Sequence, residues 1–480
     1  MTPFDIITNQ LYLLQLENYN LPRYWRLFWR RGFLIRERRQ ALVWTNKLRA
    51  IFALSMIIYI YAMAMAAIGA PALALPFWLT VGVAVVAGWL LFGTWAILAT
   101  LLLAPFDYLV KQRVIRAATR AVREHPKLKV IAITGSYGKT TMKEVVAAAL
   151  SERFIVIKTD ENKNTPLGVA RLILEKLTPQ TEILLLEMGA YRRGEIAQLC
   201  AIARPHISIL TGINESHLER FGSLAATIAA KFEIVTCARD QATVILNADD
   251  ERVSKHYHDY TGGRNVLFYS AYNDKRCPYH VANKRFAYDD LTQHADITRV
   301  EDTVGSVKTS FLGEYIFGDI IAARMVAREL RVSAEDFRRG IAKLKPIAHR
   351  LQPIAGQNGI LVIDDSYNGS AHGVEEAIRV LERFKDRRKL YVTPGLVETG
   401  DQARALHERI GKRLARVADV VILINNSVTH YIVQGLLANG FAKKDIIFFP
   451  TAVEAHREMQ KITKPGDVVL FQNDWPDNYS

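Results

Sequence analysis

The segment that decides the fold is Val130–Thr141, whose sequence is VIAITGSYGKTT. Its apolar start predicts a buried parallel strand, and a helical run over residues 142–150 follows the glycine-rich turn. In this arrangement backbone N–H groups at a helix N-terminus hold phosphate, a lysine reaches the outer phosphates, and a hydroxyl can hold Mg²⁺. We therefore predict a nucleotide-phosphate site formed by Gly135, Ser136, Tyr137, Gly138, Lys139, Thr140 and Thr141.

The spacing of this turn departs from the common phosphate loop. Only Ser136 and Tyr137 separate Gly135 from the Gly-Lys pair, where the common loop has four residues. Glycine turns before helices also occur for structural reasons alone, so the turn by itself leaves a structural role open.

Length and composition indicate a folded protein of about three domains. The chain has 480 residues, of which 50% are apolar and 23% are charged, so it is neither disordered nor hydrophobic throughout. Its three cysteines, Cys200, Cys237 and Cys277, form no CxxC pair. This spacing argues against a zinc ribbon and against a disulfide framework, and it suits a reducing compartment.

The net charge of +14 is concentrated on either side of one apolar segment. Residues 1–50 carry nine Lys or Arg against three acids, and residues 107–129 carry seven against two. Residues 50–106 contain no Asp, Glu, Lys or Arg. The positive charge therefore flanks the apolar segment, which argues against a nucleic-acid surface.

The uncharged segment is long enough for two membrane crossings of roughly 20 residues each. We predict one crossing over residues 51–68 and a second over 77–104, with a turn that begins at Gly69-Ala70-Pro71. A pair of buried core helices is the alternative. Basic flanks place both ends in the cytoplasm. We therefore predict a multi-pass cell-membrane protein with two helices and its other domains in the cytoplasm.

A cationic and aromatic segment, Arg23–Arg31 with the sequence RYWRLFWRR, precedes the first predicted crossing. Such a mixture suits a segment that lies in the lipid headgroup layer, with Trp at the interface and Arg on anionic lipid. A solvated charged helix and a nucleic-acid arm are the alternatives. Because the segment adjoins the hairpin, we expect membrane lipid as its partner and no nucleic acid.

Several further motifs follow the turn and together resemble those of one enzyme family. The segments are NTPLG at 164–168, LLLEMGA at 184–190, TGINESHLE at 211–219, IAAKFEI at 228–234 and LNADD at 246–250. With TGSYGKTT, their order is similar to that of the Mur ligases, ATP-dependent enzymes that build the peptide of the bacterial cell wall. The resemblance covers about residues 128–480. VIDDSYN at 362–368 is most similar to the branch that adds D-alanyl-D-alanine to a UDP-muramoyl tripeptide.

The resemblance implies two Mg²⁺ sites and a modified lysine. Thr140 and Glu187 would hold the Mg²⁺ between the β- and γ-phosphates of ATP, and His217 would hold the second. Lys231 corresponds to a lysine that family enzymes carboxylate with CO₂. The resemblance also counts Lys139 and Asn214 among the catalytic residues.

Other positions correspond to binding residues of the family. Asn247, Arg350 and Asp365 match nucleotide-binding positions. Asn164, Tyr367 and Asn368 match substrate-binding positions. Taken singly, Glu187 could only end a strand, and Lys231 could be a solvated helix lysine. Their occurrence in order after the loop favours the catalytic interpretation.

We therefore expect an α/β protein with three parts. These are a basic interfacial segment and membrane hairpin at 1–112, a central ATP-binding domain at 113–347, and a C-terminal Rossmann-like ligase domain at 348–480. Apolar runs at 360–363, 390–392, 420–424, 446–449 and 468–471 predict an open parallel sheet in the last domain. The implied reaction forms an amide bond through an acyl phosphate on a cell-envelope precursor.

The sequence departs from the family pattern at several positions. Tyr315 and Asp319 stand where the family has a His and a nucleotide-facing Asn, so adenine recognition is expected to differ. Gly369-Ser370-Ala371 replaces Ala-Asn-Pro, and a closing Lys-Gly-Ser motif is absent. The hairpin occupies the place of the domain that grips the UDP end of the substrate, which leaves a lipid-linked acceptor open.

Three other functions were weighed. A glutaminase-coupled amidating subunit needs a four-Cys zinc ribbon that three scattered cysteines cannot build, so we expect no zinc. A folate polyglutamylating ligase shares the core, but its folate-loop signature is not found. The third is a nucleotide-binding membrane scaffold without ligase activity. The joint occurrence of Glu187, His217 and Lys231 argues against it, because nucleotide binding alone needs no second metal ion. The sequence assigns neither the amine nor an oligomeric state.

Overall fold

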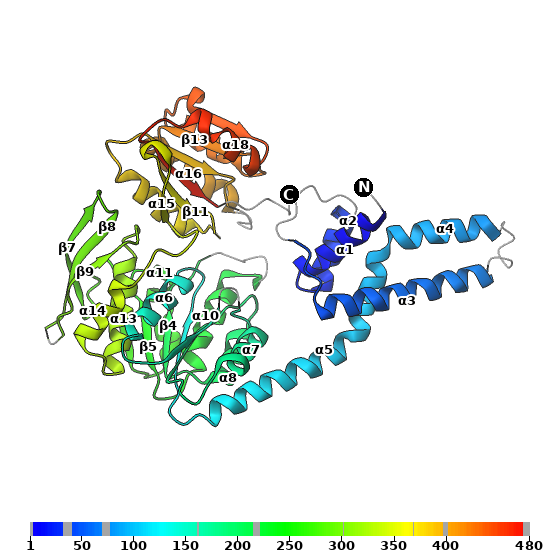
Figure 1. The fold of residues 1–480 in the computed structure, drawn as a ribbon, viewed down its shortest axis with the longest axis horizontal. Coiled ribbons are helices and arrows are strands. Elements are labelled where there is room, and N and C mark those ends of the chain that lie inside the picture. Colours follow the sequence, from blue (N-terminus) through cyan, green and yellow to red (C-terminus); the bar gives the residue numbers. More distant parts are fainter. Residues whose placement is uncertain are drawn as a thin grey trace. The chain divides into compact units, whose positions relative to one another are not determined.

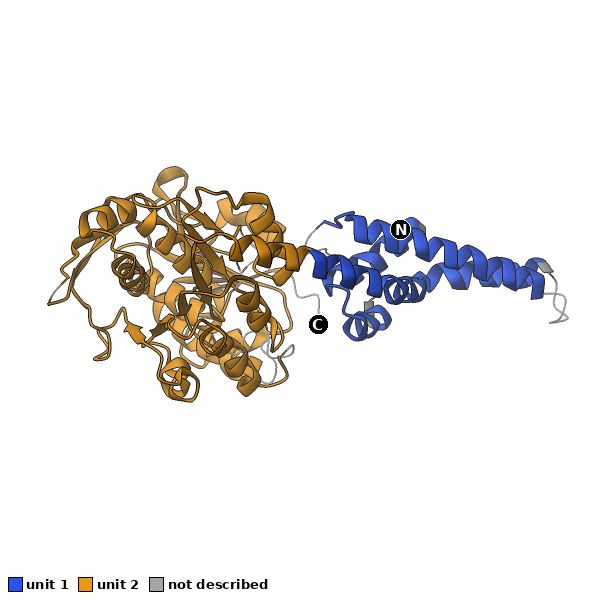
Figure 2. Cartoon of the chain, turned by 90° about the horizontal axis from the view of Figure 1, so that it is seen from below, with its two compact units in different colours: residues 1–113 blue, residues 114–480 orange. Residues whose placement is uncertain are grey.

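The computed structural model describes residues 3–31, 41–69, 77–160, 163–214, 221–300, 302–367, 369–396 and 402–473. The chain divides into two compact units, residues 1–113 and residues 114–480 (Figure 2). The second unit carries the two α/β domains.

The first unit is helical. It contains α1 (Pro3–Leu16), α2 (Leu21–Arg31), α3 (Asn46–Gly69), α4 (Phe77–Leu90) and the first part of α5 (Phe92–Arg123) (Figure 1). Its core lies where α1 and α2 pack on the N-terminal parts of α3 and α5, and it includes Leu11, Phe28, Ile51 and Phe92. Among the described residues, α3 and α5 are long and apolar enough to cross a membrane.

The predicted second crossing is not one helix. A single helix was predicted over 77–104, whereas the structure ends α4 at Leu90 and starts α5 at Phe92. The buried amide of Gln10 stabilises this break: its Nε2 donates to the carbonyl oxygen of Leu90 at 2.8 Å. Its Oε1 accepts from the N–H of Gly93 at 2.6 Å. Backbone groups freed at a helix end need such partners away from water. The predicted turn residues Ala70 and Pro71 lie outside the described residues.

The central domain is built on a six-stranded parallel sheet in the order β2-β3-β1-β4-β5-β6. The strands are β1 (Lys129–Thr134), β2 (Val156–Lys158), β3 (Ile183–Glu187), β4 (Ile207–Leu210), β5 (Thr243–Asn247) and β6 (Val266–Tyr269). Its helices are α6 (Lys139–Leu150), α7 (Pro166–Lys176), α8 (Glu195–Ala203), α10 (Leu224–Thr236), α11 (Glu251–His256), α12 (His258–Thr261), α13 (Ile316–Glu329) and α14 (Ala334–Ala342).

Helices cover both faces of this sheet, which explains why its strands are apolar runs rather than alternating patterns. One core packs α6 and α13 on one face, and the other packs α7, α8, α10 and the end of α5 on the opposite face. In register, Ile133 of β1 pairs with Glu187, and Thr134 pairs with Leu210. The carboxyl ends of β1, β3 and β4 therefore meet where the phosphate turn begins.

A three-stranded antiparallel sheet joins this core. It consists of β7 (His280–Ala287), β8 (Thr292–Thr298) and β9 (Gly305–Thr309), in the order β7-β8-β9. Arg324 of α13 contacts Asp302 before β9 through two hydrogen bonds of 2.9 and 2.5 Å. This sheet was not predicted.

The C-terminal domain has a mixed sheet in the order β10-β11-β15-β12-β13-β14. Its strands are β10 (Gln352–Ala355), β11 (Leu361–Asp365), β12 (Lys389–Thr393), β13 (Val420–Ile424), β14 (Ile446–Phe449) and β15 (Val468–Gln472). Its helices are α15 (Ala371–Glu382), α16 (Ala403–Val417), α17 (Thr429–Leu437) and α18 (Ala452–Ile462), with 3₁₀ turns η2 (Gln357–Gly359) and η4 (Lys443–Asp445).

The predicted all-parallel sheet is corrected at one edge. The five apolar runs form β11 to β15 and are parallel, but β10 pairs with β11 antiparallel. Strand β10 is short and contains Pro353, which cannot donate a ladder hydrogen bond and is tolerated only at a sheet edge. It has no long apolar run that could have revealed it.

Helices α16 and α17 approach closely through two glycines. A Cβ atom on Gly411 would lie 2.2 Å from the carbonyl oxygen of Ile432, and one on Gly435 would lie 2.2 Å from that of Glu408. The two helices therefore contact each other through their backbones. No flexible side chain of a described residue lies there that could move aside for an added methyl group.

We predict that Gly411→Ala destabilises the C-terminal domain by about 1–2 kcal/mol, because the added methyl group overpacks the helix pair. Helix propensity alone would favour alanine by about 1 kcal/mol. The exposed neighbour Lys412, changed to Ala, is the control and should stay within about 0.5 kcal/mol of the wild type. Denaturant unfolding checks both, and equal or higher stability of Gly411→Ala would contradict the close packing.

Candidate functional site

The phosphate turn between β1 and α6 depends on glycines. Gly138 is the N-cap of α6 and has a φ of 74°, a conformation that residues with a Cβ adopt at a cost. A Cβ atom on Gly135 would lie 2.1 Å from Oγ1 of Thr211. The glycines thus let the turn pack against the end of β4 while its N–H groups start a helix, where an anion is stabilised.

Lys139 lies inside this turn and faces its backbone. Its Nζ donates to the carbonyl oxygens of Gly135 at 2.8 Å and of Ser136 at 3.4 Å. Burial lowers the pKa of Lys139, an effect that the carboxylate of Glu187 opposes. An anion bound at the turn would further favour the charged form of this lysine.

Glu187, the last residue of β3, is the centre of the site. Its Oε2 accepts a hydrogen bond from the hydroxyl of Thr140 at 3.1 Å, and its Oε1 accepts one from the amide of Asn164 at 3.1 Å. Gly189 makes room for Asn164, since a Cβ there would lie 2.6 Å from the Asn164 side chain. The structure therefore brings together three of the residues singled out in the sequence.

A residue that the sequence analysis missed, Lys143, completes this cluster. It is 1% exposed, its Nζ lies 3.5 Å from Glu187 Oε2, and it donates to the carbonyl oxygen of Thr159 at 2.9 Å. Burial raises the pKa of Glu187, but Lys139 and Lys143 together with the hydrogen bonds from Asn164 and Thr140 outweigh burial, so the pKa is lowered. The signal in the sequence was a second lysine one helical turn after Lys139.

The donor set at this point fits Mg²⁺. A hydroxyl and an ionised carboxylate are hard oxygen ligands, and Mg²⁺ commonly takes one or two such ligands together with phosphate oxygens and water. Within the described ranges no three His, Cys, Asp or Glu side chains gather as a metal site. A metal ion here would thus be held by Thr140, Glu187 and the bound nucleotide.

Lys231 of α10 is buried beside the end of β3. It is 4% exposed, and its Nζ lies 3.4 Å from the carbonyl oxygen of Ala190. Burial, reinforced by the positive charge of Lys139, lowers the pKa of Lys231 to about 7. A substantial fraction of this lysine is therefore an uncharged, nucleophilic amine at neutral pH.

The loop after β4 is only partly described. Asn214 is 6% exposed, while His217 lies outside the described residues. Asn247 at the end of β5 donates from Nδ2 to the carbonyl oxygen of Thr211 at 2.7 Å. It also accepts from the N–H of Asp249 at 2.9 Å, so its amide holds the ends of β4 and β5 together.

Tyr137 links the phosphate turn to two other elements. Its hydroxyl donates to Oδ2 of Asp250 at 2.6 Å, and its ring stacks on that of His372 with centroids 4.7 Å apart. Gly212 permits this placement, because a Cβ there would lie 2.3 Å from the tyrosine ring. His372 belongs to α15 of the C-terminal domain and was not singled out in the sequence.

Arg350 brings the start of the C-terminal domain to the phosphate turn. Its Nη2 donates to the hydroxyl of Thr140 at 3.3 Å, and its guanidinium carbon lies 5.0 Å from the centre of the Tyr367 ring. Nearby, Asp365 accepts from the N–H of Leu351 at 3.2 Å, and burial raises the pKa of Asp365 to about 8. Asn368 lies outside the described residues.

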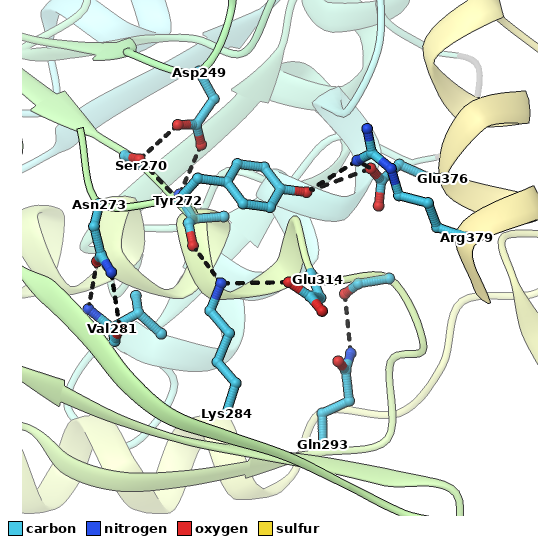
Figure 3. A network of polar contacts seen from close by, with 12 residues as sticks. Asp249, Ser270, Tyr272, Asn273, Val281, Lys284, Gln293, Glu314, Glu376 and Arg379 are labelled. Carbon is cyan, nitrogen blue, oxygen red and sulfur yellow. Dashed lines mark hydrogen bonds and ion pairs between the residues drawn. The ribbon is translucent and has the colours of Figure 1, made fainter. Parts of the chain in front are cut away.

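Contacts between polar side chains further join the two domains of this unit (Figure 3). Tyr272, which follows β6, points toward Glu376 and Arg379 of α15, with distances of 3.4 and 3.5 Å from its hydroxyl. Glu314 pairs with Lys284 at 3.4 Å and with Arg383 at 2.7 Å. A cavity of about 460 Å³ lies here, lined by Tyr272, Glu314, Glu376, Arg379, Val380 and Arg383. Because its acids and bases pair with one another, we interpret this surface as a domain contact.

Asp319 of α13 is an unusual buried acid. It is 6% exposed, and its Oδ2 has no hydrogen-bond partner within the described part of the chain. Burial raises the pKa of Asp319 well above its ordinary value, because burial disfavours the charged form of the carboxyl group.

We predict that Asp319→Asn increases thermal stability in a pH-dependent way. Because the pKa is raised on folding, the wild type loses stability as pH rises from about 4 towards the raised value. Asparagine mimics the neutral acid and has no such loss. The melting temperature of the variant should thus equal that of the wild type near pH 4 and exceed it increasingly as the pH rises above that value. A constant difference across this range, or the same trend in the exposed control Asp240→Asn, would contradict the assignment.

Comparison with known proteins places this chain in a family. Residues 133–327 match the Mur ligase middle domain, and residues 349–472 match the Mur ligase glutamate ligase domain. The UDP-N-acetylmuramoyl-tripeptide–D-alanyl-D-alanine ligase of Escherichia coli is 30% identical over 325 residues, which cover 65% of this chain and 70% of that protein. The protein of the same name from Mycobacterium tuberculosis is 30% identical over 365 residues, covering 72% and 70%.

Solved structures agree with these matches. The MurF ligase of Thermotoga maritima in complex with ADP has a TM-score of 0.66 and 28% identity, covering 76% of this chain and 80% of that one. A folylpolyglutamate synthase of Mycobacterium tuberculosis has a TM-score of 0.58 at 13% identity, covering 78% and 95%, and shares the fold alone. Mur ligases are ATP-dependent ligases that use Mg²⁺. From the two domain matches and the coverage of its relatives, the chain belongs to the Mur ligase family.

Proposed function

We propose that this protein joins D-alanyl-D-alanine, or a related amine, to a muramoyl peptide at the expense of ATP. The observation that carries the proposal is the cluster of Thr140, Asn164 and Glu187 beside Lys139. Relatives named for this reaction are matched over the same domains. The arrangement suits phosphoryl transfer to a carboxylate, a reaction in which charge repulsion is the main obstacle.

The reaction has two steps. First, an oxygen of the acceptor carboxylate attacks the γ-phosphorus of ATP, the bond to ADP breaks, and an acyl phosphate forms. Then the amine attacks the acyl carbon, the bond to phosphate breaks, and the amine loses a proton. Lys139 neutralises the phosphates that must approach an anion. Thr140 and Glu187 would hold Mg²⁺, which would supply positive charge at the transferred group.

The roles of the remaining residues are proposed from the family positions that they match. Arg350, Asp365 and Asn247 serve nucleotide binding, and Asn164, Tyr367 and Asn368 serve substrate binding. Asn214 and His217 are assigned as catalytic residues, and His217 would hold a second Mg²⁺. We propose the same three parts as before: a membrane-attached part at 1–112, an ATP-binding domain at 113–347 and a ligase domain at 348–480.

Lys231 is proposed to carry a carbamate. A lysine amine reacts with CO₂ only when it is uncharged, and burial gives Lys231 a pKa of about 7. The product is an anion, which would relieve the repulsion between Lys231 and Lys139 and could support the second metal ion.

Membrane attachment through the apolar helices of the first unit is part of the proposal, with the catalytic domains in the cytoplasm. Helices α3 and α5 have the length and composition for it, and positive charge lies on both flanks of the apolar segment. This observation favours a second candidate acceptor, a lipid-linked muramoyl peptide. A soluble UDP-linked acceptor needs no membrane attachment.

We predict ATP-dependent phosphate release that requires both a muramoyl tripeptide and D-alanyl-D-alanine. The full chain in detergent or lipid vesicles is assayed with UDP-linked and lipid-linked acceptors, and the product mass is measured. A mass increase equal to the dipeptide minus water supports ligation. ATP binding without turnover on either acceptor would instead support a nucleotide-binding scaffold.

We predict a CO₂ requirement that weakens as pH rises. Because carbamate formation consumes the neutral amine and releases a proton, the CO₂ concentration that gives half-maximal activity should fall more than about tenfold from pH 6 to pH 8. Lys231→Ala should lose activity by about 100-fold or more. The exposed Lys255, changed to Ala, is the matched control. Full activity of Lys231→Ala in CO₂-free buffer would refute the carbamate.

A further inference from the structure

The paired helices α3 and α4 form a hairpin whose far part is apolar and uncovered. The two helices lie side by side in Figures 1 and 2, and the hydroxyl of Tyr59 donates to the carbonyl oxygen of Val85 at 3.2 Å. Ile68 near the end of α3 and Trp78 near the start of α4 are each 73% exposed. Further exposed apolar side chains of this hairpin are Ile57, Ile60, Tyr61, Met65, Leu79, Val83, Val85, Val86 and Leu90.

The near end of the hairpin is fixed by the break between α4 and α5. Gln10, which is fully buried, bonds both the Leu90 carbonyl and the Gly93 N–H there. From this break α5 leaves in a different direction from α4, as Figure 1 shows. The second arm of the hairpin is therefore α4 alone.

Helix α2 lies at the level of the break. Its buried residues Tyr24 and Phe28 contact Gly93, where a Cβ would lie 2.3 Å from the Tyr24 hydroxyl. Its opposite face exposes Trp25 and Trp29 together with the cation Arg26. A helix with one buried apolar face and an outer face of Trp and Arg suits the lipid headgroup layer.

The first half of α5 has the same amphipathic character. Phe92, Ala96 and Ala99 pack on the helical core of this unit. A second stripe at helical spacing, formed by Leu98, Leu101, Leu102, Phe106 and Leu109, is exposed. The stripe ends at Lys111, which pairs with Asp107 at 2.7 Å.

The length of the free hairpin decides how deep it can reach. Helix α4 has 14 residues, so at ~1.5 Å per residue it is about 21 Å long. The hydrocarbon core of a bilayer is about 30 Å thick. If the break and α2 lie at the headgroups, the deep end of α4 lies inside the bilayer, about 9 Å short of the far side of the hydrocarbon core. A full crossing by α4 would have to thin the membrane by about a third.

We propose that the α3–α4 hairpin enters the bilayer from the cytoplasmic side and returns without crossing it, with α2 and the exposed stripe of α5 in the headgroup layer. The sequence between the two helices, residues 70–76 (APALALP), has no charged or hydrogen-bonding side chain. Such a sequence suits hydrocarbon better than water on the far side. This proposal rests on the proposed membrane attachment and replaces the two full crossings expected from the sequence.

The test measures the depth of the hairpin end in the full chain. Single cysteines, Ile68→Cys or Trp78→Cys, are introduced after Cys200→Ala, Cys237→Ser and Cys277→Ser, and each carries a fluorophore. The chain is reconstituted in phosphatidylethanolamine and phosphatidylglycerol vesicles that contain lipids with a nitroxide at the headgroup or deep in the acyl chain. Ala41→Cys, exposed before α3, is the control.

The expected result is quenching at positions 68 and 78 that is at least about twofold stronger with the deep nitroxide, whose place is the bilayer centre. The control should be quenched more strongly by the headgroup nitroxide. Stronger headgroup quenching at positions 68 and 78, with labelling by an impermeant maleimide from the face opposite the catalytic domains, would overturn the proposal and restore two crossings.

A third outcome concerns the attachment itself. If neither nitroxide quenches positions 68 and 78, and high salt at alkaline pH releases the chain from vesicles, both the proposed hairpin insertion and membrane attachment fail. Ligase activity is measured on the same samples. Its loss together with intact deep quenching would count against the proposed reaction while leaving the hairpin insertion supported.

Discussion

The catalytic unit depends on one buried carboxylate, that of Glu187. Leaving such an anion without partners inside a protein costs several kcal/mol, so its position must be supplied with compensating charge and hydrogen bonds. Thr140 and Asn164 provide the hydrogen bonds, and Lys143 and Lys139 provide the charge. Since these groups come from α6, the loop before α7 and the end of β3, the sheet must form correctly before the site exists.

This constraint explains which features could be predicted from sequence. Strand, turn and helix around TGSYGKTT follow from local pattern, and parallel pairing brings the ends of β1 and β3 together. Lys143 could not be distinguished from a solvated helix lysine, because its burial depends on Thr159 and Glu187, which are distant in sequence. His372 was missed for the same reason, since only tertiary packing stacks it on Tyr137.

Fold features were missed where local pattern is weak or is overridden. Strand β10 has four residues and an internal proline, so neither length nor periodicity reveals it. The break at Leu91 lies within an uninterrupted apolar run, where hydropathy favours a continuous helix. It is stabilised by Gln10, about 80 residues earlier in the chain. A single buried amide thus stabilises two shorter helices in place of one long helix. The composition of the apolar run contains no sign of this distant partner.

The physical value of a membrane tether depends on the acceptor. A soluble acceptor reaches a tethered enzyme by the same three-dimensional diffusion that serves a free one. An acceptor anchored in the same membrane meets the enzyme within a thin layer, which raises its effective concentration without any new contact. In the proposed attachment, the basic second half of α5, with Lys111, Arg113, Arg116, Arg120 and Arg123, would add attraction to anionic lipid. Tethering of this kind would favour a lipid-linked acceptor, because it brings a soluble acceptor no kinetic advantage.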